Sequence, residues 1–206
     1  MTKTKIIKTE MDWKDVKNVS RTTVNKSHSE VEATDRFKMK MLISEHSPIR
    51  LLKVRWLWEG LKSWISVHFS RHKFECFIST QRTDRTGIDR SELSQDALVN
   101  FEGEANAQHL IDVARKRLCY CSSQETREQM EDLKITLMKN SDTYEVGFVL
   151  VPNCIYRYGC PEFEKCGHFD VFLDHCPNAH TLDIEDRYKE YNDIFYNEGV
   201  INERRN

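Results

Sequence analysis

Residues 52–82 read LKVRWLWEGLKSWISVHFSRHKFECFISTQR, and their pattern predicts a strand, a helix and a second strand in succession. Apolar side chains at the even positions of residues 52–58 alternate with others, which is typical of a strand with one buried face. Over residues 61–68 the apolar positions recur at helical spacing, so we expect an amphipathic helix that runs into residues 71–73. The apolar, aromatic run at residues 74–79 predicts the second strand.

The flanking segments continue this interleaving of helices and strands. The capping-box pattern Ser27-x-x-Glu30 predicts a helix that ends before Pro48, and the first dozen residues have the composition of a frayed tail. Further along the chain we expect helices over residues 105–118 and 122–137, then a strand over residues 144–150. No Gly-rich turn joins a strand to a helix, so the sequence favours an α+β domain over a doubly wound one.

Length, composition and charge bound the class of protein. A chain of 206 residues with 39% hydrophobic side chains makes one medium domain. No apolar run approaches the roughly 20 residues of a membrane helix, and no secretory signal is evident, so we expect a cytoplasmic protein with no membrane partner. The net charge is −2, but basic residues concentrate before residue 74 and acidic residues after it. This asymmetry suits a phosphate-bearing ligand, or a solvated surface with charge pairing between subunits.

The densest cluster of cationic side chains is His68-Phe69-Ser70-Arg71-His72-Lys73, at a predicted helix-to-strand junction. Such a cluster complements the negative end of a helix dipole, or grips a phosphate. Other segments add further guanidinium groups, those of Arg82, Arg85, Arg90 and Arg117. The planar fork of an arginine side chain matches the oxygens of a phosphate or an imide. Asn106 and Arg117 are eleven residues apart, about three helical turns, so we expect both on one helix face toward a pocket or a subunit surface.

Five motifs, in chain order, resemble those of the flavin-dependent thymidylate synthases (ThyX). The central one is Arg71-His72-Lys73 with the extended segment to Arg82, which is similar to the family's Arg-His-Arg hallmark. The others are Ser20-Arg21-Thr22-Thr23, Glu45-His46-Ser47-Pro48-Ile49, Arg90-Ser91-Glu92-Leu93, and Asn106-Ala107-Gln108-His109-Leu110 running on to Arg117. The resemblance covers residues 16–138.

The resemblance implies a role for each matching position. Arg117 would be the catalytic residue, facing the pyrimidine edge and stabilising its ionised form. The residues that would hold FAD are Thr23, Ser47, Arg71, His72, Lys73, Asn106 and Asp112. The residues that would bind deoxyuridine monophosphate (dUMP) are His68, Arg71, Arg82, Arg90 and Arg117.

The same resemblance implies an enzyme that reductively methylates dUMP to dTMP, with methylenetetrahydrofolate as one-carbon donor and NADPH as reductant. It implies a mixed or antiparallel sheet with packed helices over residues 1–150, and a homo-oligomer of the family's tetrameric kind whose active site is shared between subunits. Two alternatives stay open. One is a different one-carbon transfer, such as hydroxymethylation of a pyrimidine nucleotide. The other is a catalytically silent relative that binds a nucleotide or, less in keeping with the motifs, a nucleic acid.

Several positions depart from the family pattern. Lys73 replaces an arginine and so loses a bidentate fork while keeping the charge. Gln108 also stands where the family has arginine, and the segment from Lys73 to Arg82 is one residue shorter. Only seven residues separate Arg82 from Arg90, where relatives carry a long helical segment. These departures bear on folate binding, NADPH use and subunit packing.

The resemblance does not extend to residues 151–206, a Cys/His-rich C-terminal extension. Four of the seven cysteines lie there, and thiolates and imidazoles in a reducing compartment can form a zinc site. The spacing lacks a C-x2-C knuckle, so small buried thiols in a loop-rich cap are the alternative. The candidate ligands are Cys154, Cys160, Cys166 and Cys176, with His168, His175 and His180. We expect Cys76, Cys119 and Cys121 to be ordinary core or near-core residues.

Overall fold

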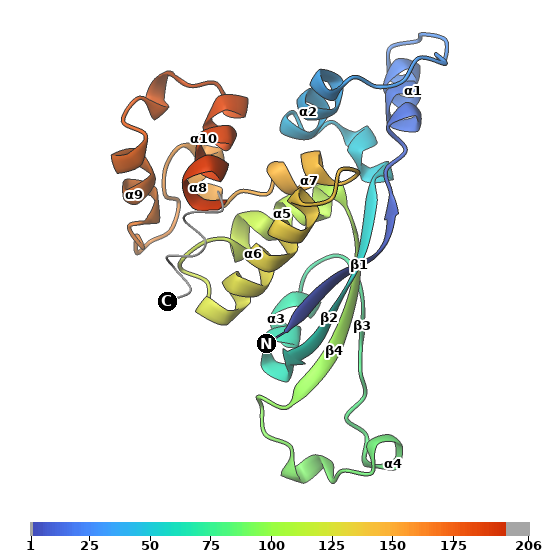
Figure 1. The fold of residues 1–206 in the computed structure, drawn as a ribbon, viewed down its shortest axis with the longest axis vertical. Coiled ribbons are helices and arrows are strands. Elements are labelled where there is room, and N and C mark those ends of the chain that lie inside the picture. Colours follow the sequence, from blue (N-terminus) through green and yellow to red (C-terminus); the bar gives the residue numbers. More distant parts are fainter. Residues whose placement is uncertain (1, 197–206) are drawn as a thin grey trace.

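The computed structural model of the protein describes residues 2–196 and is built on one four-stranded sheet. The strands lie in the order β1 (Lys3–Glu10), β2 (Lys53–Lys62), β4 (Leu98–Asn106) and β3 (Glu75–Ile78), and each neighbouring pair is antiparallel. The two longest strands, β2 and β4, form the centre of the sheet, and β1 and β3 form its edges (Figure 1). The fold is therefore α+β with an antiparallel sheet, as the sequence predicts.

One face of the sheet is packed with tryptophan. Trp56 and Trp58 on β2 are almost fully buried, and their rings meet edge to face with centroids 5.5 Å apart. Across the sheet, Trp56 pairs with Gly103 of β4. A Cβ atom at Gly103 would lie 2.5 Å from the Trp56 ring, so the indole occupies the space of a side chain. Glycine is therefore required at this close approach.

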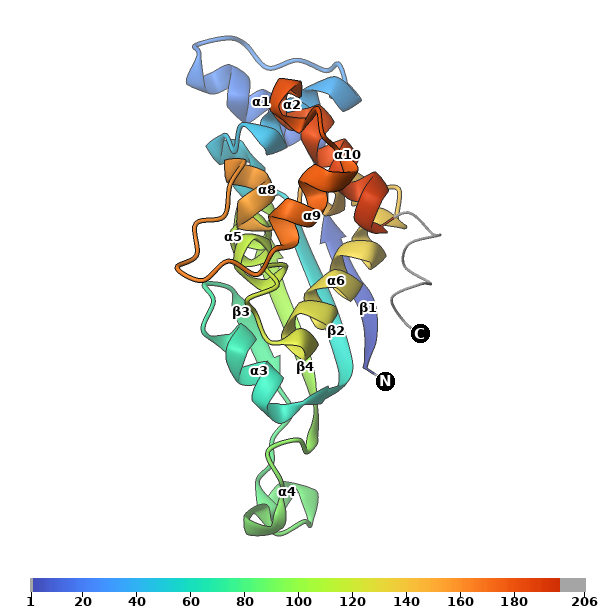
Figure 2. The same cartoon turned by 90° about the vertical axis from the view of Figure 1, so that its left-hand side faces the viewer.

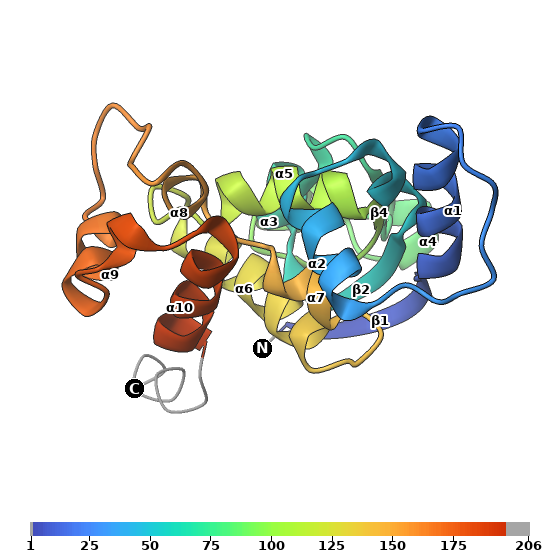
Figure 3. The ribbon, with the colours of Figure 1, turned by 90° about the horizontal axis from the view of Figure 1, so that it is seen from above.

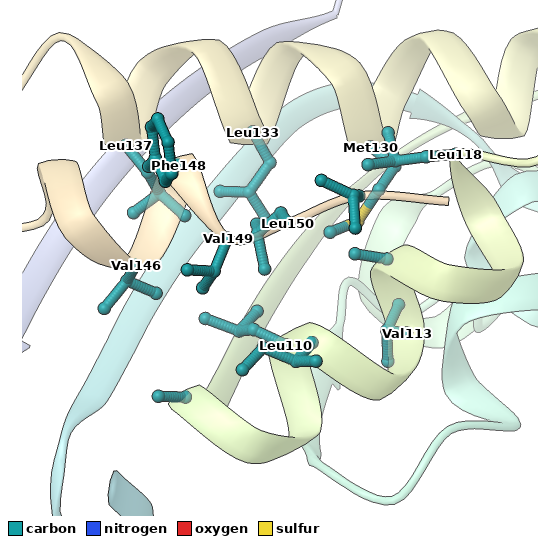
Figure 4. Packing of buried hydrophobic residues seen from close by; sticks show 14 of the residues in the cluster. Leu110, Val113, Leu118, Met130, Leu133, Leu137, Val146, Phe148, Val149 and Leu150 are labelled. Atoms are coloured by element: carbon teal, nitrogen blue, oxygen red, sulfur yellow. The ribbon is translucent and has the colours of Figure 1, made fainter. Parts of the chain in front are cut away.

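Three helices cover the tryptophan face: α3 (Ser63–Ser70), α5 (Ala107–Arg117) and α6 (Gln124–Met138) (Figure 2). α3 follows β2 directly and α5 follows β4 directly, so the sheet fixes where both helices begin. Between α5 and α6 lies a dry core in which Leu110 and Val113 face Met130 and Leu133 (Figure 4). All four side chains are at most 3% exposed.

Most of the other helices lie at the upper end of the sheet and beyond α5 and α6. In the N-terminal half these are α1 (Trp13–Thr23), α2 (Asp35–Ile43) and the 3-10 helix η1 (Ser47–Leu51). In the C-terminal part they are α7 (Tyr144–Phe148), α8 (Asn153–Arg157), α9 (His168–His175), η3 (Ala179–Thr181) and α10 (Ile184–Tyr196). Seen from above, α8 to α10 form a layer on the side of α5 and α6 that faces away from the sheet (Figure 3). Among the described residues, no helix has the length and apolar character needed to span a membrane.

A projection formed by residues 79–97 connects β3 to β4 and extends away from the rest of the chain (Figure 1). It contains the short helices α4 (Thr83–Thr86) and η2 (Arg90–Glu92), and every residue from 82 to 92 is exposed. Gly87 ends α4 with φ of 72°, in the left-handed region that glycine adopts without strain. We call this segment the projection below.

Five predicted elements are confirmed: β2, α3, β3, α5 and α6. Three expectations are wrong. Residues 3–10 are not a tail but the edge strand β1, whose lysines mark an exposed edge. The helix predicted from Ser27 begins only at Asp35, where Thr34 provides the N-cap.

The third wrong expectation is the strand over residues 144–150. Residues 144–148 form helix α7, and every residue from 145 to 150 is buried. Burial on all sides removes the polar positions that would distinguish a helical period from an alternating one. The sequence pattern also did not predict α1 or β4.

Candidate active site

The C-terminal ends of α3 and α5 meet, and a hydrogen-bonded pair of functional side chains lies where they touch. The Nε atom of Arg117 donates to Nε2 of His72 over 2.8 Å, and its Nη2 donates to the backbone carbonyl of His68 over 3.0 Å. Because His72 accepts at Nε2, its neutral ring carries the proton on Nδ1. The helix ends therefore position a guanidinium group against a neutral imidazole.

The electrostatics of the pair follow from burial and from the surrounding cations. Burial, reinforced by the Arg117 charge, lowers the pKa of His72 to about 4, so the ring is neutral at physiological pH. Burial and the charges of Arg117 and Arg71 lower the pKa of His68 in the same direction. Both histidines therefore act as neutral polar groups beside fixed positive charge.

Arg117 is half-buried, yet within residues 2–196 it forms no ion pair with a carboxylate. Its hydrogen bonds go to a neutral imidazole nitrogen and to a carbonyl oxygen. Burial and the nearby charge of Arg71 lower the pKa of the guanidinium, although an arginine stays protonated in proteins. A partly desolvated cation of this kind gains most from an anionic ligand.

An open pocket of about 280 Å³ lies beside the pair. Its walls come from the turn between α3 and β3, from the end of α5 with the loop after it, and from the C-terminal extension, which contributes Glu162. Glu162 lies 4.0 Å from Lys116, so this carboxylate is already paired. The lining residues are His72, Lys116, Arg117, Cys119, Cys121, Ser122 and Glu162.

Aromatic packing holds the histidines of this site in place. The His72 ring is stacked parallel to Phe74, with centroids 6.3 Å apart, and Phe74 in turn contacts Trp56 of the sheet. The His68 ring meets Trp64 edge-on at 5.4 Å, and its Nδ1 lies 3.0 Å from the Thr126 hydroxyl of α6. The site is thus fixed to the sheet on one side and to α6 on the other.

The structure brings together some of the residues predicted from sequence and separates others. His68, His72 and Arg117 are in contact, and Arg71 is close enough for its charge to act on His68 and Arg117. Lys73 is exposed next to them. Within one chain, Arg82 and Arg90 lie apart from this group on the projection, where Arg82 pairs with Asp84.

The other predicted FAD contacts lie elsewhere. Thr23 ends α1 and Ser47 begins η1, and both are exposed. Asn106 is the N-cap of α5, and its side-chain oxygen accepts a hydrogen bond from the His109 backbone. It therefore stands at the opposite end of α5 from Arg117. Asp112 is exposed between them.

One charged cluster near α5 was not predicted. Glu45 forms an ion pair with Arg115 and accepts a hydrogen bond of 2.7 Å from Gln108. The Arg115 guanidinium also lies 3.7 Å from the ring centroid of Tyr156, at the end of α8. Glu45 and Gln108 each belong to a motif noted in the sequence, but their pairing depends on contacts between distant segments. Sequence spacing carries no signal for such contacts.

Comparison with known proteins supports the fold. No protein-family model and no curated protein matches the sequence. Among solved structures, a flavin-dependent thymidylate synthase ThyX from Helicobacter pylori with FAD and dUMP aligns with TM-score 0.60 and 10% identity, covering 72% of this chain and 99% of that chain. A second structure of ThyX from the same organism gives TM-score 0.57 and 11% identity over 73% and 97% of the two chains. A UMP/dUMP methylase, PolB, from Streptomyces cacaoi bound with 5-Br dUMP gives TM-score 0.57 and 12% identity over 73% and 96%. The chain therefore has the fold of these nucleotide-modifying enzymes.

Proposed function

We propose that the protein binds a uracil nucleotide and methylates carbon 5 of its base, in the manner of a flavin-dependent thymidylate synthase. The observation that carries this proposal is Arg117, a half-buried guanidinium that borders an open pocket and has no carboxylate partner within residues 2–196. Facing the uracil imide, this cation stabilises the negative charge that the base develops when carbon 5 becomes nucleophilic. The ThyX fold and the dUMP or 5-Br dUMP in the neighbours' structures support the same ligand class.

His72 has a positioning role in this proposal. It accepts from Nε of Arg117 and leaves one Nη group of the guanidinium for a ligand, since Nη2 already donates to the His68 carbonyl. A protonated imidazole could not accept that hydrogen bond. The low pKa of His72 therefore preserves the orientation of Arg117 at neutral pH.

The residues beside the pocket fit a flavin dinucleotide. Arg71 and Lys73 are exposed cations on either side of the neutral His72, and they suit the anionic parts of FAD. When bound, FAD supplies the redox chemistry that reductive transfer of a one-carbon unit requires. We propose methylenetetrahydrofolate and NADPH as co-substrates on the resemblance alone. We also propose four FAD contacts that do not lie at this pocket within a single chain: Thr23, Ser47, Asn106 and Asp112.

A second copy of the chain completes the proposed site. Arg82 and Arg90 lie on the projection, and a partner chain is the means by which they reach a nucleotide at Arg117. The projection and the adjoining strand edges also expose apolar side chains, with Phe77 59%, Ile88 52% and Leu98 69% exposed. Exposed apolar groups on a protruding segment favour a protein contact. We propose a homo-oligomer, with the family's tetramer as the expected size, and residues 1–150 as the part that carries the site.

The test is binding followed by product analysis. Purified protein is mixed with FAD, and dUMP or UMP binding is measured by calorimetry. Methylenetetrahydrofolate and NADPH are then added, and the nucleotide is examined by mass spectrometry. We expect the mass gain of one methyl group for wild type and more than a tenfold loss of nucleotide affinity for Arg117→Ala, since a charge-assisted hydrogen bond contributes about 1.5–3 kcal/mol. Arg36→Ala, exposed on α2, is the matched control and keeps wild-type affinity.

The same experiment separates the alternatives. A mass gain corresponding to a hydroxymethyl group would identify a different one-carbon transfer, in keeping with the replacement of an arginine by Lys73 beside the pocket. Nucleotide binding without any product would identify a silent binding protein. Unaltered binding in Arg117→Ala would contradict the role given to Arg117 in either case.

A further inference from the structure

Three cysteine thiols from two distant segments converge next to the candidate active site. Cys119 and Cys121 lie in the loop between α5 and α6, and Cys166 lies in the loop before α9. Their Sγ atoms all lie within 4.8 Å of one another. In a tetrahedral zinc–thiolate site with Zn–S bonds of about 2.3 Å, sulfur atoms are about 3.8 Å apart. A small contraction of two loops brings the three thiols to that geometry.

A fourth thiol borders the same place. Cys154 on α8 is 6% exposed, and it lines a cavity of about 170 Å³ together with Cys119, Cys160 and Cys166. Cys154 and its neighbour Ile155 belong to the hydrophobic core, so the thiol is held on the cavity wall. Cys160 lies instead in the loop that connects α8 to α9. This difference favours Cys154 as the fourth ligand.

We propose that Cys119, Cys121, Cys154 and Cys166 bind a structural zinc ion through their four thiolates. Four thiolates close the coordination sphere of zinc and leave no open position, as in other structural sites. The site differs from the one predicted from sequence. Cys119 and Cys121 were expected to be ordinary core or near-core residues, and of the two Cys119 is buried whereas Cys121 is exposed. Cys176 belongs neither to the thiol cluster nor to the cavity lining.

The zinc ion would fasten the C-terminal extension to the end of α5. Other contacts already cross this boundary, among them Tyr120, which stacks on His168 with ring centroids 4.0 Å apart, and Lys116, which lies 4.0 Å from Glu162. Cys119 follows Arg117 by two residues, and both line the 280 Å³ pocket. Metal binding would therefore fix the loop that follows Arg117 at the end of α5. This inference does not depend on the reaction that the site carries out.

The primary measurement is the zinc content of the full-length protein, purified without chelators from cells grown with zinc and analysed by mass spectrometry of the metal. We expect about one zinc per chain. Cys119→Ser and Cys166→Ser are expected to reduce the zinc content at least fivefold. Cys76→Ser and Cys176→Ser are matched controls that keep it, because both thiols lie outside the cluster.

Two further readouts keep the proposal testable where a variant does not fold. In wild-type protein, p-mercuribenzoate should release zinc in proportion to the number of cysteine thiols that it modifies. A metallochromic dye measures the released zinc. Replacement of zinc by Co²⁺ should give a thiolate-to-cobalt charge-transfer band, which Cys154→Ser weakens and Cys160→Ser does not. A folded wild-type protein without stoichiometric zinc, or a disulfide among these cysteines, would overturn the proposal. If Cys160→Ser weakens the band and Cys154→Ser does not, the assignment of the fourth ligand is wrong.

Discussion

At the scale of single residues, the candidate site depends on the protonation states of Arg117 and His72. Arg117 is always charged, and His72 is kept neutral by burial and by that same charge, which together hold its pKa low. The hydrogen bond between Arg117 Nε and His72 Nε2 exists only while His72 is neutral. Protonation of His72 would remove an acceptor and place two cations 2.8 Å apart. The pair is therefore a source of pH-dependent stability as well as part of the proposed ligand site.

We predict that the protein loses stability as the pH falls from about 6.5 to about 4. Folded His72, with its lowered pKa, takes up its proton near pH 4, whereas in the unfolded chain it does so near the ordinary histidine pKa of 6.5. Between these values the unfolded state binds more protons, so acid favours unfolding. His68, whose pKa is lowered for the same reasons, acts in the same direction.

The measurement is urea unfolding of wild type and of His72→Gln at several pH values between about 4 and 7, the range that spans the two pKa values of His72. Glutamine retains a polar side chain without the titration, so the free energy of unfolding of His72→Gln should decline less steeply with acid. His180→Gln, at an exposed position on η3, is the control and should follow wild type. Parallel pH profiles for His72→Gln and wild type would show that folding does not lower the pKa of His72.

At the scale of elements, the sequence predicts best where one face of an element is buried. Val54, Trp56 and Trp58 are buried on β2, and the alternation that they form is legible in the sequence itself. The unpredicted β4 contains the same alternation, in Val99, Phe101 and Ala105. However, Gly103 interrupts this alternation of buried side chains. Glycine is needed there because the Trp56 ring occupies the space of a side chain. That explanation depends on a contact between strands, which a single sequence does not show.

The candidate site follows the same rule. The clustering of His68, Arg71, His72 and Lys73 could be recognised from the sequence because these residues are adjacent. The hydrogen bond between His72 and Arg117 spans 45 residues and was not predicted, since the family resemblance assigned His72 to FAD and Arg117 to the pyrimidine. Helical spacing did not show that Asn106 is the N-cap of α5, at the opposite end of the helix from Arg117.

The sheet gives a second prediction, in which Gly103→Ala destabilises the fold. The added methyl group would lie 2.5 Å from the indole of Trp56, which is 1% exposed and packed against Trp58 and Phe74. Overpacking of a close-packed core costs about 1–3 kcal/mol. Thermal unfolding followed by circular dichroism measures the loss. Gly159→Ala is the matched control, because a Cβ there meets nothing within 4 Å. Equal melting temperatures for both variants would contradict the steric account of Gly103.

At the scale of the whole molecule, one chain presents half of the site that we propose. The sheet, α3 and α5 hold His72 and Arg117, while the projection carries Arg82 and Arg90 away from them (Figure 1). The projection has almost no buried surface of its own, and in the proposed oligomer contact with another chain would fix its place. An active site shared between copies accounts for both features together.

Mixing two defective proteins tests the shared site. Arg117→Ala removes the pocket cation, and Arg82→Ala removes a cation of the projection, so each protein alone should bind dUMP weakly. In a mixed oligomer, a site can take Arg117 from one chain and Arg82 from another. Such a site is intact when the first chain has a wild-type Arg117 and the second has a wild-type Arg82. After co-refolding at equal concentrations, random assembly restores about a quarter of the wild-type sites. Calorimetry measures the number of tight sites. If mass spectrometry shows that mixed oligomers have formed but calorimetry finds no tight dUMP sites, Arg82 and Arg117 do not act in one site across two chains. Recovery would show that the projection of one chain reaches the Arg117 pocket of another.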